Sequence, residues 1–129
     1  MPLRPALAVC ALALLSLLAG CSQKDPVQVE VYAEVTASHL EGETVVFEPR
    51  DGSQAKTLEC STEARYESHI SPRMGTVTVT ITDGAGKATV ATYDSVRADE
   101  RELEGEPGTW TLNVDWQGFS GAIHAALTC

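Results

Sequence analysis

The chain has 129 residues, with 9 Lys and Arg against 18 Asp and Glu, and a formal net charge of −9 at pH 7. The basic residues stand singly among carboxylates, so the basic stripe that nucleic-acid binding needs is missing and we exclude that class of function. The length suffices for one domain with its own hydrophobic core after an amino-terminal leader.

The first twenty residues have the three parts of a secretory signal. Arg4 gives a basic start, residues 6–15 form an apolar run that Leu17 and Leu18 continue, and small residues precede Cys21. This run is shorter than the ~20 apolar residues that a membrane-spanning helix requires. We therefore expect a signal peptide that is removed, rather than a permanent transmembrane anchor.

The cleavage region, Leu18-Ala19-Gly20-Cys21, resembles the lipobox of bacterial lipoproteins. The resemblance implies that residues 1–20 are removed and that Cys21 carries lipid at the new amino terminus. The alternative is an ordinary signal peptide with a chance cysteine. Each buried methylene of an acyl chain contributes ~0.8 kcal/mol, so the several chains of such lipoproteins would anchor the protein stably to the membrane. Ser22 replaces the aspartate that favours inner-membrane retention, which implies sorting to the outer membrane in a cell with two membranes.

Two cysteines remain once Cys10 is cleaved away and Cys21 is acylated, namely Cys60 and Cys129. An exported protein matures in an oxidising compartment, so a single leftover pair predicts a disulfide rather than a metal site or a catalytic thiol. Removal of Arg4 leaves eight Lys and Arg against 18 Asp and Glu, a formal charge of −10.

Residues 21–26 form a short tether, since the five residues after Cys21 reach at most ~18 Å, and residues 27–129 form the domain. Alternation of apolar and polar residues predicts strands with one buried face, most clearly over residues 27–36 and 76–82. Further strands are predicted over residues 44–48, 56–60, 64–70, 87–93, 109–116 and 122–129, with turns at 51–52, 83–86 and 117–120. Seven or eight short strands and no amphipathic helix indicate an all-β fold, an antiparallel β-sandwich or small barrel. The predicted core comprises Val29, Val31, Val35, Val77, Val79, Ile81, Trp110, Leu112, Val114, Ile123 and Leu127.

The segment Gly108-Thr109-Trp110-Thr111-Leu112, followed by Gly121 and an apolar closing strand, is similar to the last hairpin of secreted bacterial β-sandwich domains. Pre-peptidase carboxy-terminal domains and the P domains of subtilisin-like proteases end in this way. Those domains are typically appended to enzymes, whereas we expect no attached enzyme here. The resemblance therefore implies a sandwich fold and no particular role.

Residues 95–106 break the strand pattern and are dense in charge, which indicates a helical turn or a mobile loop. The segment is a candidate binding site for a basic partner, because loops on rigid scaffolds carry binding residues and its negative field reaches about 8 Å. Two other interpretations stay open, a solvated loop and a calcium site, although the usual calcium-loop order is missing. The carboxylates in question are Asp99, Glu100, Glu102, Glu104 and Glu106, against Arg97 and Arg101.

No catalytic or metal-binding constellation stands out. His39, His69 and His124 lack the spacings of zinc sites, so we expect surface or half-buried histidines, no metal and no cofactor. Gly118-Phe119-Ser120-Gly121 falls one residue short of the G-x-S-x-G pattern of serine hydrolases and is better interpreted as a turn. Trp110 and Trp116 could form a sugar-stacking platform, but they share a strand phase with Leu112 and Val114, which favours the core.

These observations predict a membrane-anchored lipoprotein of the cell envelope that is not an enzyme and acts as an interaction or structural module for a protein or envelope partner. The alternative is an inhibitor of a secreted or exogenous hydrolase such as a lysozyme, since an acidic surface suits a basic enzyme. An enzymatic role would require a pocket of converging polar groups with perturbed pKa values.

Overall fold

The computed structural model describes residues 27–36 and 38–129, so the leader, the tether and Cys21 lie outside the described residues. The described part of the chain is built from β-strands. They are β2 (Gln28–Val35), β3 (Ser38–Glu41), β4 (Thr44–Phe47), β5 (Arg50–Cys60), β6 (Glu63–Thr82), β7 (Ala88–Tyr93), β8 (Arg97–Glu104) and β9 (Gly108–Thr128). Within these residues no helix is long and apolar enough to cross a membrane.

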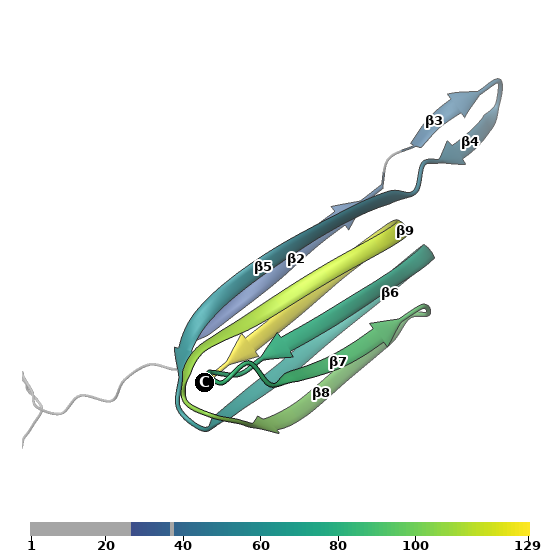
Figure 1. The fold of residues 1–129 in the computed structure, drawn as a ribbon. Helices are drawn as coiled ribbons and strands as arrows, with labels where there is room; N and C mark the ends of the chain where they lie inside the picture. The colour runs from purple at the N-terminus through teal and green to yellow at the C-terminus, as the bar shows by residue number, and fades with distance from the viewer. Residues whose placement is uncertain (1–26, 37) are drawn as a thin grey trace, which may run out of the picture.

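The two longest strands, β6 and β9, bend midway and take part in both layers of the fold (Figure 1). In the first layer, the first half of β9 lies between β5 and the second half of β6, which also pairs with β7. In the second layer, the second half of β9 lies between β2 and the first half of β6, which also pairs with β8. All these pairings are antiparallel, so the predicted antiparallel β-sandwich of seven or eight strands is confirmed.

The sequence predicts two separate strands in place of β6 and two strands joined by a turn in place of β9, and this is wrong. Pro72 and Gly75 disturb the ladder of β6, where the register with β9 shifts twice, but the pairing resumes beyond them. Gly75 has φ +84°, and a Cβ there would lie 2.2 Å from the carbonyl oxygen of Gly118. The close approach that glycine permits lets the two strands bend together. The two halves of β9 therefore do not form the predicted closing hairpin with each other, because both pair with β6.

The core lies between the two layers and follows the alternation seen in the sequence. Nine of the eleven predicted core residues are buried, and the other two, Val29 and Val35, are half-buried against the core. The largest buried side chains are Trp110, Tyr66, Tyr93 and Phe119. Of these, sequence patterning identified only Trp110, because Tyr66 and Tyr93 lie in weakly patterned strands and Phe119 lies at the bend of β9.

The dipeptide Asp51-Gly52, predicted as a turn, lies instead near the start of β5. A β-bulge between Arg50 and Gly52 absorbs the irregularity, so the strand stays paired with β9. The Asp51 carboxylate accepts a hydrogen bond from the backbone N–H of Gly118 (2.7 Å) and thereby ties the start of β5 to the bend of β9.

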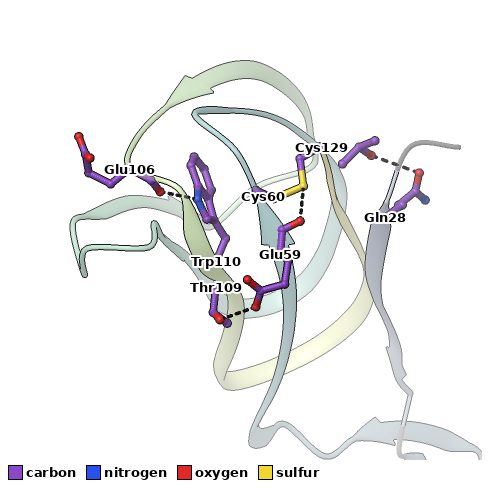
Figure 2. The surroundings of a disulfide bond; sticks show 8 residues. Gln28, Glu59, Cys60, Glu106, Thr109, Trp110 and Cys129 are labelled. Carbon is purple, nitrogen blue, oxygen red and sulfur yellow. Dashed lines mark hydrogen bonds between the residues drawn. A yellow bond between two sulfur atoms is a disulfide. The ribbon is translucent and has the colours of Figure 1, made fainter. Parts of the chain in front are cut away.

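One end of the sandwich is closed by a disulfide between Cys60 and Cys129, the pair that the sequence predicts (Figure 2). The disulfide links the end of β5 in the first layer to the end of the chain in the second. Val27 and Cys129 exchange two backbone hydrogen bonds there (2.9 and 2.8 Å), so the described chain begins and ends at this place. We call it the disulfide end.

The opposite end carries a projecting β-hairpin made of β3 and β4 (Figure 1). Its strands pair with each other in a separate two-stranded sheet. The chain enters the hairpin from β2 and leaves it into β5, the two strands that flank β9. We call this the hairpin end.

Candidate functional site

The acidic segment over residues 95–106 is not a helical turn or a loop, because most of it forms the edge strand β8. Strand β8 pairs with β6 from Arg97 opposite Ile70 to Glu104 opposite Glu63. The sequence of β8 does not show the usual alternation of apolar and polar residues, because charged residues lie on both faces of the strand. Asp99, Arg101 and Leu103 are half-buried, and the glutamates between them are exposed. Asp99 therefore faces away from Glu100, Glu102 and Glu104.

Arginines neutralise much of the charge on β8. Arg65 of β6 forms ion pairs with Glu100 and Glu102 and hydrogen-bonds Glu67 on its own strand. Arg101 lies 2.9 Å from Asp99 and lowers the pKa of that carboxyl below its usual value. These ion pairs weaken the negative field that a free acidic loop would produce. Charged side chains on an edge strand also discourage its pairing with the edge of another sheet.

A buried polar network holds β8 against the core. The Tyr66 hydroxyl lies 2.9 Å from the Tyr93 hydroxyl, which donates to Asp99 (2.9 Å). Ser68 also approaches the Tyr93 hydroxyl (3.4 Å). Burial raises the pKa of Tyr66 far above its usual value, so the tyrosine stays neutral. The network joins β6, β7 and β8, and it explains why a segment that looks like a mobile loop is an ordered strand.

The remaining carboxylates of the segment, Glu104 and Glu106, lie at the disulfide end. Together with Thr62, Glu63 and Gly105 they line a shallow depression. The main chain of Glu106 is fully used, since its N–H donates to Asp83 (2.9 Å) and its carbonyl accepts from the Trp110 indole (2.8 Å; Figure 2). The five predicted carboxylates are therefore not brought together as one patch. In residues 27–36 and 38–129 no group of three or more His, Cys, Asp or Glu residues has the arrangement of a metal site.

The β3–β4 hairpin presents an apolar pair to solvent. Leu40 and Val45 face each other across the two strands, with 70% and 52% of their surfaces exposed. A single exposed apolar residue is ordinary, whereas here two of them lie opposite each other on a projecting element. The hairpin is also acidic, because Glu41, Glu43 and Glu48 lie on or beside it.

The other face of the hairpin carries an ionic cluster. The two ring nitrogens of His39 contact the carboxylates of Glu41 (2.9 Å) and Glu48 (2.6 Å), and Arg50 lies 3.6 Å from Glu48. The hydrogen bonds to Glu41 and then Glu48 raise the pKa of His39 above its usual value. The ring therefore joins β3 to the residue that follows β4, and the two carboxylates favour its protonated form.

The histidines, the serine and the tryptophans considered in the sequence analysis lie at separate places in the fold. His69 is exposed and His124 is half-buried, where it contacts Glu30 (2.8 Å). Ser120 is buried in the bend of β9, not in a turn between strands, and its hydroxyl donates to the carbonyl of Val35 (3.1 Å). Trp110 is 1% exposed, so its placement in the core is confirmed. Trp116 is only half-buried and lines a depression at the root of the hairpin.

Sequence patterning missed the apolar pair of the hairpin, although a signal was present. The order Glu41-Gly42-Glu43-Thr44 places a glycine first in a two-residue turn, which is typical of tight β-hairpins. Four residues per strand are too few for the period of two to stand out, so the sequence predicts no strand at Leu40.

No protein-family model matches the sequence, and no curated protein sequence matches it either. Among solved structures, the chain is similar to a carbohydrate-binding module, TmCBM61, determined in complex with beta-1,4-galactotriose. The TM-score is 0.47 and the sequence identity 14%, over 78% of this chain and 83% of that one. The sandwich architecture described above follows from the strand pairing within this chain.

Proposed function

We propose that this protein is a lipid-anchored lipoprotein of the bacterial cell envelope that acts as a non-enzymatic interaction module. In this proposal Cys21 carries the lipid, and the β3–β4 hairpin meets a protein or envelope partner. The observation that carries it is that the disulfide end, where Val27 pairs with Cys129, lies opposite the hairpin in the domain (Figure 1). A lipid on Cys21, six residues before Val27, would hold the disulfide end near the membrane and direct the hairpin away from it.

The composition of the hairpin supports contact with a protein. Leu40 and Val45 offer an apolar centre, with Glu43 next to them in the turn, while Glu41 and Glu48 contact His39 on the other face of the hairpin. Contact surfaces commonly combine an apolar core with a polar rim, and the negative charge would steer a basic partner toward the hairpin.

Site-specific crosslinking in cells tests the proposal. A photo-reactive amino acid is placed at Leu40, at Val45 or at Val90, which is the matched control because it is 57% exposed on β7. We expect one discrete adduct from both hairpin positions and none from Val90, and we expect Val45→Asp to abolish the Leu40 adduct. Equal adducts from all three positions, or none from the hairpin, would contradict the role given to the hairpin.

The anchor is tested separately with radiolabelled fatty acid. We expect label in the wild-type protein and none in the Cys21→Ala variant, which should also leave the membrane fraction. Label that persists in the variant would contradict the lipobox interpretation.

The alternative function, inhibition of a secreted or exogenous hydrolase such as a lysozyme, is favoured by one feature. A narrow, acidic, projecting hairpin could enter the cleft of a basic enzyme. Inhibition of a basic lysozyme that weakens with added salt and is lost in Leu40→Asp would support this alternative. Full lysozyme activity in an excess of the wild-type protein would exclude it.

A further inference from the structure

A depression of about 490 Å³ lies at the root of the hairpin, where β2 ends and β5 begins. Its volume falls within the ~300–1,000 Å³ of typical small-molecule sites. The side chains that line it come from three strands and the residue after β2, and they are Glu34, Val35, Thr36, Arg50, Asp51 and Trp116. The hairpin residues Leu40 and Val45 are not among them, so this surface is separate from the one proposed above for partner binding.

The Trp116 ring is placed over β5 by a glycine. Gly52 lies opposite Trp116 in the strand register, and a Cβ on Gly52 would lie 2.6 Å from Cε2 and Cζ2 of the indole. Any other residue at position 52 would therefore displace the ring. The indole is fixed against the backbone on one side and lines the depression on another.

The two tryptophans of the chain differ in what their indole N–H groups do. The buried Trp110 donates to the carbonyl of Glu106 (2.8 Å). The Trp116 N–H makes no hydrogen bond with the described residues, and its Nε1 lies beside Gly52, 2.7 Å from where a Cβ there would stand. Trp N–H groups usually find a partner when they are removed from water, so this group can still donate to a ligand that reaches it.

The walls of the depression are held in place by the bend of β9. Ser120 donates to the carbonyl of Val35 (3.1 Å), which fixes the end of β2. Asp51 accepts from the N–H of Gly118 (2.7 Å), which fixes the start of β5. A site formed before its ligand arrives loses less entropy on binding than one that must be assembled.

The charged side chains that line the depression indicate which class of ligand it would bind. The depression is lined by two carboxylates, Glu34 and Asp51, and one guanidinium, Arg50, so it disfavours an anion and offers both hydrogen-bond acceptors and a donor. A neutral ligand with one apolar face and several hydroxyl groups can use both kinds of polar group and the ring. Its C–H face can lie on the indole, its hydroxyls can donate to the carboxylates, and its oxygens can accept from Arg50 and the Trp116 N–H. We propose that the Trp116 depression is a binding site for a neutral saccharide.

The test titrates the full mature protein in detergent with short β-linked oligomers of glucose, galactose, mannose and N-acetylglucosamine. The Trp110→Phe variant leaves Trp116 as the only tryptophan, so its emission reports on the site directly. The indole N–H resonance of Trp116 in the wild-type protein gives the same information without a substitution. We expect at least one of these oligomers to shift both signals, with a Kd below about 1 mM.

Two variants then assign the binding to the site. Trp116→Ala should weaken binding at least about tenfold, and Arg50→Ala should weaken it as well. Val90→Ala, on an exposed strand face outside the depression, should bind as the wild type does. The proposal is overturned if no oligomer shifts the Trp116 signals. It is also overturned if binding survives in folded Trp116→Ala, or if trilysine or a phosphorylated sugar binds and the neutral sugars do not.

Discussion

At the disulfide end, segments far apart in the sequence are tied to one another, whereas at the hairpin end two short strands pair only with each other in the described chain. The disulfide end joins Cys60 to Cys129, the N–H of Gly105 to the carbonyl of Thr62, and the N–H of Gly84 to the carbonyl of Glu106. The hairpin end leaves Leu40 and Val45 in solvent. The difference sets the two ends of one small domain apart, since long-range tertiary contacts gather at the disulfide end and the exposed apolar pair lies at the hairpin end.

Asp83 shows how the disulfide end is organised. Its buried carboxylate accepts backbone hydrogen bonds from Ala85 (3.0 Å), Lys87 (2.8 Å) and Glu106 (2.9 Å). One side chain thus supports the turn between β6 and β7 and also fixes the segment that leads into β9. These hydrogen bonds, above all those from Glu106 and Lys87, lower the pKa of Asp83.

Removal of the disulfide should give the largest effect on stability. The bond joins residues 69 apart in the sequence, and closing a loop of that length stabilises the fold by about 4 kcal/mol on the chain-entropy model. We expect the double variant Cys60→Ser and Cys129→Ser, measured by urea unfolding, to lose a comparable amount, and the reduced wild type to behave like it. A loss below about 1 kcal/mol would mean that the other contacts close this end without the disulfide.

Substitution of Asp83 by asparagine should give the next largest effect and should depend on pH. A carboxyl whose pKa is lowered in the folded state stabilises the fold fully above its ordinary pKa of about 4 and loses this contribution as the pH falls through the lowered value. The wild type should therefore unfold at a higher temperature than Asp83→Asn at neutral pH, and the difference should shrink in acid. Asp94→Asn, an exposed control, should change neither value. A constant difference between pH 7 and pH 3 would contradict the proposed hydrogen-bonded anion.

Sequence patterning predicted the sandwich and most of its core because a period of two survives wherever a strand has one buried face. The residues Val77, Val79 and Ile81 alternate with threonines, and the structure buries all three. The disulfide is predicted by elimination, because the expected export and acylation leave Cys60 and Cys129 as the remaining thiols.

Local sequence patterns do not predict whether a strand continues through a bend, or whether a charged segment pairs with a sheet, because tertiary contacts decide both. Strands β6 and β9 continue through Pro72 and Gly118 because the two bends pack against each other. No local sequence pattern predicts this contact. In β8, the charges of Asp99 and Arg101 neutralise one another on the inward face, so a strand has the composition of a loop. The half-buried position of Trp116 depends on Gly52, which lies on another strand.

Charge placed on the hairpin should have little effect on stability. Because Leu40 is 70% exposed, the Leu40→Asp variant should change the free energy of unfolding by no more than about 0.5 kcal/mol. The measurement is urea unfolding under the conditions used for the cysteine variants. A loss above about 1 kcal/mol would show that the hairpin packs on the body of the protein, and the contrast between the two ends would then fail.

The smallest expected effect is a local pH response of the hairpin. Glu41 and then Glu48 raise the pKa of His39, so the ring's contribution is present below the ordinary imidazole pKa of about 6.5 and is lost as the pH rises through the raised value. Arg50 is the other charged group in this cluster, and its contact with Glu48 should persist when His39 loses its proton. Amide chemical shifts of β3 and β4 should therefore change in a single step above pH 6.5, while the global unfolding temperature stays nearly constant because the hairpin pairs only with itself in the described chain. His39→Gln should remove the step. If the step is absent in the wild type, or centred at or below the ordinary pKa, the carboxylates do not hold the ring in solution.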